Sequence, residues 1–124
     1  MITIEDYKKE DGYYHYNGMT FNTAQDMISE MLDFCGCGMP DEAIDFVYKA
    51  LNLVKINREM KYDDWYKEVK KLLPNHGVEY FVWYYLDSKE FTEHGGSVPG
   101  WLTEEGVNMM RLIEDYAKIR ESYG

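Results

Sequence analysis

The feature that most constrains the fold is an unbroken run of seven apolar or aromatic residues, Tyr80–Leu86. A run this apolar must be largely buried, so the other elements have to pack around it. Its aromatic side chains favour a strand, whereas its length and its helical surroundings favour a helix, and we predict a helix over residues 78–88. A polar stretch containing Gly95-Gly96 and Pro99-Gly100 follows, which indicates a glycine-rich loop over residues 92–102.

The composition indicates one packed domain over residues 1–124. The chain is 45% hydrophobic and 16% aromatic, which is far from a disordered composition, and its length leaves no room for a second domain of ordinary size. We find no signal-peptide pattern, no stretch of about 20 apolar residues that would span a membrane, and two cysteines, too few for a secreted disulfide scaffold. We therefore expect a cytoplasmic protein.

Residues 1–22 are predicted to form a β-hairpin arm. Two short aromatic segments, 13–16 and 19–21, flank Asn17-Gly18, and this dipeptide supplies the positive φ angles of a tight hairpin turn.

Residues 23–124 are predicted to form a helical core. Apolar residues recur at helical spacing after Thr23, after Pro40, over residues 62–73 before Pro74, and after Thr103, in addition to the apolar run. The glycines Gly36 and Gly38 are expected to end the first of these helices. The fold class we predict is mainly α, with about five helices in one compact domain and a small N-terminal β-hairpin.

The charge argues against direct nucleic-acid binding. Twenty-three acidic residues oppose thirteen basic ones, giving a net charge of −10, and a phosphate backbone repels such a surface. Asp26, Glu30 and Asp33 recur one helical turn apart. This stripe is either a solvated helix face or a set of carboxylates spaced to occupy a groove that normally holds nucleic-acid phosphates.

The hairpin tyrosines form a second candidate surface. Tyr13, Tyr14 and Tyr16 cluster there, and tyrosine is enriched at protein interfaces because it combines a large ring with a polar tip. Side chains alternate along a strand, so the three cannot all face one side. Burial between the hairpin and the helices is the other interpretation.

Cys35-Gly36-Cys37-Gly38 indicates a candidate zinc site. Two thiolates one residue apart can reach one soft metal ion, with His94 as a third ligand and His15 or His76 as a fourth. The competing interpretation is that Cys35 is a core residue at a helix end and Cys37 lies in the turn. No cofactor other than zinc is indicated.

The segment from Glu93 to Ser97 offers a histidine base and a serine nucleophile, or simply a turn with a surface histidine. No other cluster suggests catalysis, and we predict that the chain is not an enzyme.

Residues 80–110 resemble the end of a winged-helix domain. In that family a helix is followed by a short hairpin, the wing, and by a helix that opens with Leu-Thr-x-x-Gly, which here is residues 102–106. The resemblance implies a hairpin near residues 95–100. The family's basic DNA-contacting positions are mostly acidic here, so a DNA-reading role does not carry over.

The strings FCGCGMPDEA and FTEHGGSVPGWLTEEG resemble small acidic proteins of bacteriophages and mobile elements. The resemblance implies the cytoplasm of a bacterial host cell. Such proteins are often inhibitors of host nucleic-acid enzymes, anti-CRISPR proteins included. The leading functional prediction is therefore a non-enzymatic protein that binds a basic surface of a host protein through Asp26, Glu30, Asp33 and the hairpin tyrosines. The alternatives are a small zinc-binding domain and a winged-helix-like regulator.

Overall fold

The apolar run is helical. In the computed structural model, which describes residues 3–33 and 40–123, helix α4 spans His76–Ser88. The Asn75 side chain accepts a hydrogen bond from the backbone N–H of Val78 (3.1 Å) and so caps the helix start. The run is not buried throughout, because the helical period turns Tyr80 (42% exposed) and Tyr84 (55% exposed) away from the core.

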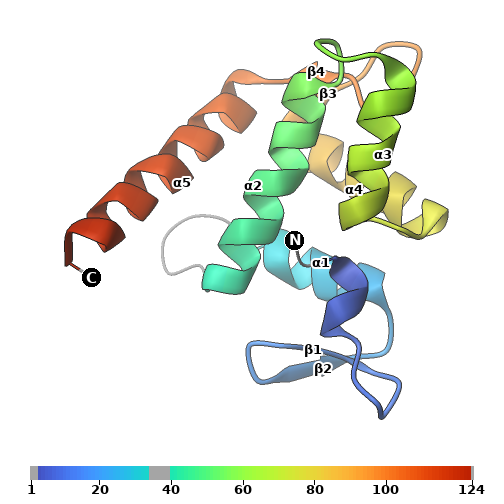
Figure 1. The fold of residues 1–124 in the computed structure, drawn as a ribbon, viewed down its shortest axis with the longest axis vertical. Helices are drawn as coiled ribbons and strands as arrows, with labels where there is room; N and C mark the ends of the chain where they lie inside the picture. Colours follow the sequence, from blue (N-terminus) through green and yellow to red (C-terminus); the bar gives the residue numbers. More distant parts are fainter. Residues whose placement is uncertain (1–2, 34–39, 124) are drawn as a thin grey trace.

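The five predicted helices are all present among the described residues. Besides α4 they are α1 (Ala24–Asp33), α2 (Asp41–Ile56), α3 (Tyr62–Leu72) and α5 (Glu104–Tyr123). Helix α2 stands between α5 on one side and α3 on the other, as Figure 1 shows. Buried side chains from all five helices join one hydrophobic cluster. The prediction of a mainly helical fold is confirmed.

The N-terminal hairpin is also confirmed. Strands β1 (Tyr14–Tyr16) and β2 (Met19–Phe21) pair antiparallel. Asn17 and Gly18 have φ values of +51° and +77°, as a type I′ turn requires. A short 3-10 helix, η1 (Ile4–Tyr7), precedes the hairpin and was not predicted. The hairpin lies against α1 (Figure 1).

The glycine-rich loop contains a second, smaller hairpin. Strands β3 (Thr92–Glu93) and β4 (Trp101–Leu102) pair antiparallel, with Glu93 opposite Trp101. The two backbones approach each other closely next to this pair, because a Cβ added to Gly100 would lie 2.1 Å from the Glu93 carbonyl oxygen.

Hydrogen bonds tie this second hairpin to the helices on both sides. The Asn57 side chain donates to the Gly100 carbonyl oxygen (2.9 Å) and so joins the end of α2 to β4. Thr103 begins α5, and its hydroxyl accepts a hydrogen bond from the Gly106 N–H (3.1 Å). The ends of α2 and α5 are therefore held close to β4.

Candidate functional site

Asp26 and Glu30 lie on the solvent side of α1. The opposite side of this helix is buried against the core through its apolar residues, which are Ala24, Met27, Ile28, Met31 and Leu32. Asp26 is exposed and Glu30 is half-buried. Within the described ranges neither carboxylate forms a salt bridge. Both charges therefore stand at fixed positions on a packed helix.

Asp33 differs from the other two acids because it is tied to α4. Its carboxylate accepts hydrogen bonds from the Tyr85 hydroxyl (2.5 Å) and from the Lys89 ammonium (2.9 Å). The Tyr85 hydrogen bond and then the Lys89 ammonium lower the pKa of Asp33 below its ordinary value. Part of the charge of Asp33 is therefore already compensated within the molecule.

The hairpin tyrosines divide between the surface and the core. Tyr13 is 44% exposed, whereas Tyr14 and Tyr16 are 7% and 3% exposed. The Tyr14 hydroxyl donates to the Glu5 carboxylate at 3.0 Å. Burial removes the rings of Tyr14 and Tyr16 from any contact surface, so of the three tyrosines only Tyr13 remains accessible.

We define the acidic α1 surface as Asp26, Glu30 and Asp33.

The three histidines each lie beside an acid, at different places in the fold. His15 pairs with Asp11 (2.8 Å) on the first hairpin, and His76 lies 3.6 Å from the carboxylate of Glu79 at the start of α4. His94 pairs with Asp87 at the other end of α4. Positions 76 and 87 are eleven helical steps apart, which is roughly 16 Å along the axis, so His76 and His94 are too far apart to bind the same metal ion.

The zinc site cannot be assembled from the described residues. Cys35 and Cys37 lie outside them, and within residues 3–33 and 40–123 no three His, Cys, Asp or Glu side chains are grouped so as to hold a metal ion. His94 contributes its Nδ1 to the contact with Asp87. The zinc alternative stays a prediction.

Asp87, Thr92 and His94 form a polar cluster where the second hairpin meets α4. The Asp87 carboxylate accepts hydrogen bonds from the Thr92 hydroxyl and pairs with the His94 ring. The edge of the His94 ring also meets Tyr84, with the ring centres 5.9 Å apart. These contacts join β3 and the residue that follows it to the end of α4. Among the described residues no hydrogen bond links Ser97 to His94.

The buried carboxylate of Glu79 is a feature that the sequence pattern did not reveal. One of its oxygens accepts a hydrogen bond from the Trp83 indole N–H (3.1 Å), and the other has no hydrogen-bond partner within the described chain. Glu79 directly precedes the apolar run, and only the fold shows that its carboxylate is buried beside Trp83.

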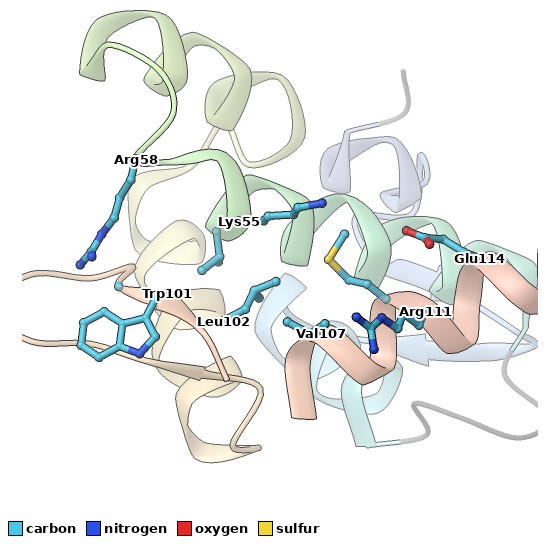
Figure 2. A pocket seen from close by; sticks show the side chains of 10 residues that line it. Lys55, Arg58, Trp101, Leu102, Val107, Arg111 and Glu114 are labelled. Atoms are coloured by element: carbon cyan, nitrogen blue, oxygen red, sulfur yellow. The ribbon is translucent and has the colours of Figure 1, made fainter. Parts of the chain in front are cut away.

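A pocket lies where α2, β4 and α5 meet, and Figure 2 shows its lining. Its volume is about 320 Å³. Three cationic side chains, Lys55, Arg58 and Arg111, line it together with the carboxylate of Glu114. Its remaining lining residues are Val54, Gly100, Trp101, Leu102, Val107 and Met110. Sequence reasoning missed this pocket because its residues come from three separate elements; the only local signal is Lys55 and Arg58, three residues apart at the end of α2.

No family model, no curated protein and no solved structure matches this chain. Within the described part of the chain, no helix combines the length and the apolar character needed to cross a membrane.

Proposed function

We propose that this chain is a non-enzymatic interaction protein of phage type, which binds a basic surface of a host protein through the acidic α1 surface and Tyr13. The observation that carries the proposal is that Asp26 and Glu30 stand free of salt bridges among the described residues on the solvent side of a helix whose other side is packed. Free carboxylates at fixed positions are available to a cationic partner.

The spacing of the acids supports a partner that normally binds nucleic acid. Positions 26, 30 and 33 rise along the helix in steps of about 6 Å and 4.5 Å, so the three acids follow one another along one side of α1. Residues 1–33 contain seven acids and two bases, and thus carry half of the net charge. A basic cleft that holds phosphates would attract this end of the molecule before contact. By occupying this cleft, the protein would compete with the nucleic acid for its partner and so inhibit it.

Charge reversal tests the proposal after the partner has been captured. The protein is first used as bait in a bacterial host lysate at low and at high salt, and the binding of the recovered partner is then measured with purified proteins. We expect Asp26→Lys with Glu30→Lys to weaken binding at least tenfold, because two attractive contacts become repulsive. The affinity of the wild type should also fall steeply with salt.

The matched control is Asp115→Lys with Glu121→Lys on α5, which changes the net charge equally at exposed positions outside the acidic α1 surface. We expect less than a threefold effect from this control pair. Equal weakening by both pairs would show that only overall charge matters, and unchanged binding by the α1 pair would refute the proposed surface. Circular dichroism of each variant establishes that the fold is retained.

A further inference from the structure

The pocket between α2, β4 and α5 concentrates positive charge in an acidic protein. Lys55, Arg58 and Arg111 line it, and within residues 3–33 and 40–123 none of the three forms a salt bridge with an aspartate or glutamate. Lys49 and Lys71, by contrast, pair with acids on their own helices. Three uncompensated cations around one cavity are the arrangement expected where an anion binds.

Arg58 is held at the pocket by an aromatic ring. Its guanidinium carbon lies 5.1 Å from the centre of the Trp101 ring, within the range of a cation–π contact. A cation–π contact uses the face of the ring and none of the N–H donors of the guanidinium, so these donors stay available to a ligand. Trp101 therefore restrains Arg58 without occupying its hydrogen-bonding groups.

The pocket floor is apolar and belongs to well-anchored elements. Met110 is buried, whereas Leu102 and Val107 are half-buried and line the cavity. The Asn57 hydrogen bond to Gly100 fixes β4 against the end of α2. Arg111 follows Val107 by one helical turn, so α5 places a cation beside the apolar floor, as the close-up in Figure 2 shows. A ligand with an anionic end and a less polar body suits this lining.

Glu114 adds an acceptor at the edge of the pocket. One of its oxygens accepts a hydrogen bond from the Tyr48 hydroxyl (2.8 Å), which keeps the carboxylate in place. A carboxylate next to cations repels a phosphate but accepts hydrogen bonds from sugar hydroxyls, as acidic residues do in nucleotide-binding proteins. Arg111 and Glu114, one helical turn apart on α5, thus offer a cation and a hydrogen-bond acceptor side by side.

We propose that this pocket binds a small nucleoside phosphate, with Lys55, Arg58 and Arg111 on the phosphates and Glu114 on the sugar hydroxyls. The volume of about 320 Å³ lies at the small end of ligand pockets, which suits one nucleotide. A nucleic-acid strand would also have to approach a chain of net charge −10, and the single nucleotide avoids most of that repulsion. This site is separate from the acidic α1 surface.

Isothermal titration calorimetry with four probes in phosphate-free buffer tests the proposal. The probes are ADP, AMP, pyrophosphate and adenosine. We expect ADP to bind at least tenfold more tightly than either pyrophosphate or adenosine, because each of these lacks one of the two parts that the pocket recognises. Pyrophosphate that binds as tightly as ADP, or no heat from any nucleotide at millimolar concentration, would overturn the proposal.

Paired substitutions locate the binding. Lys55→Gln with Arg111→Gln should weaken ADP binding at least tenfold, whereas the control Lys61→Gln with Lys67→Gln, which removes two exposed lysines elsewhere, should change it less than twofold. All of these side chains are solvent-exposed, so the variants keep the core intact. Equal effects of the two pairs would show that ADP responds only to net charge and would overturn the site.

The role of Trp101 as a positioning residue has its own readout. Trp101→Ala should weaken ADP binding severalfold because Arg58 loses its stacking partner, and Trp101→Phe should restore most of the affinity because a ring is kept. The binding of adenosine, which lacks phosphate, should be the same in both variants. A phenylalanine variant as weak as the alanine variant would contradict the assigned contact between Arg58 and Trp101.

Discussion

At the scale of single residues, folding changes the ionisation of two tyrosines of the N-terminal arm, the half-buried Tyr7 and the buried Tyr14. Burial, followed by the charges of Glu42 and Asp45, raises the pKa of Tyr7 to about 12. Burial, followed by the hydrogen bond to Glu5, raises the pKa of Tyr14 to about 12 as well. Both hydroxyls thus keep their protons in the folded chain at pH values where an unfolded chain would lose them.

This difference predicts a loss of stability at alkaline pH. Because the folded pKa exceeds the ordinary value of 10.0, the stabilisation from these hydroxyls is complete below pH 10 and is lost as the pH rises toward about 12. Tyrosinate absorbance near 295 nm should show two tyrosines that ionise near pH 12 together with loss of structure in the arm. Denatured in guanidinium, the same chain should show every tyrosine ionising near pH 10.

The variant Tyr7→Phe with Tyr14→Phe provides the control for this titration. It lacks both hydroxyls, so the component near pH 12 should shrink by two tyrosines and the stability should depend less on pH between 10 and 12. Tyr48, Tyr62 and Tyr85, whose pKa values are also raised, should still ionise late. A component near pH 12 that keeps its full amplitude in the variant would contradict the prediction.

At the scale of elements, Gly106 in the first turn of α5 lets this helix approach the backbone of Phe91, the residue before β3. A Cβ at this position would lie 2.1 Å from the Phe91 carbonyl oxygen, which is a backbone atom that cannot swing aside. Alanine is normally better than glycine in a helix by about 1 kcal/mol. Here the clash outweighs that gain, so we predict that Gly106→Ala destabilises the protein by about 1–3 kcal/mol in urea unfolding.

Gly96→Ala is the matched control for the α5 prediction. The space around Gly96 is open to 4 Å, so the same chemical change there should alter the unfolding free energy by no more than about 0.5 kcal/mol. If Gly106→Ala were neutral or stabilising, the close approach of α5 to Phe91 would be incorrect.

The helices were predictable because their signals are local. Thr23, Pro40, Pro74 and Thr103 mark helix ends, and the apolar spacing between them defines each helix. Asn17-Gly18 similarly predicted its own turn. The 3-10 helix at 4–7 carries no comparable apolar repeat, and the pairing of β3 with β4 depends on only two residues in each strand.

The candidate sites were less predictable because they depend on contacts between distant segments. The spacing of Asp26, Glu30 and Asp33 predicts that they share one side of a helix. The contacts of Asp33 with Tyr85 and Lys89 could not be predicted, because these residues lie more than 50 positions away in the sequence. The sequence shows that the hairpin tyrosines cannot all face one side, because side chains alternate along a strand. Which of them are buried depends on how the hairpin packs against the rest of the fold. The basic pocket combines three elements and has no motif.

At the scale of the whole molecule, the net charge of −10 should make stability depend on salt. Raising the ionic strength from about 0.01 M to 0.15 M shortens the screening length from roughly 30 Å to 8 Å and weakens the mutual repulsion of the acids. We predict that Tm rises by about 2–4 °C over this range in scanning calorimetry. Asp26→Asn with Glu30→Asn should show a smaller increase, and a Tm that falls with salt would contradict the prediction.

The packing of α1 against α4 has a consequence for synthesis on the ribosome. More than 40 residues separate the two helices in the chain, so α1 leaves the ribosome long before the helix that covers it has been made. During that interval Met27, Ile28, Met31 and Leu32 have no α4 to pack on. We expect the acids on the other side of α1 and on the preceding arm to oppose aggregation of nascent chains during this interval, because like charges repel. These acids would then act before the protein meets any partner.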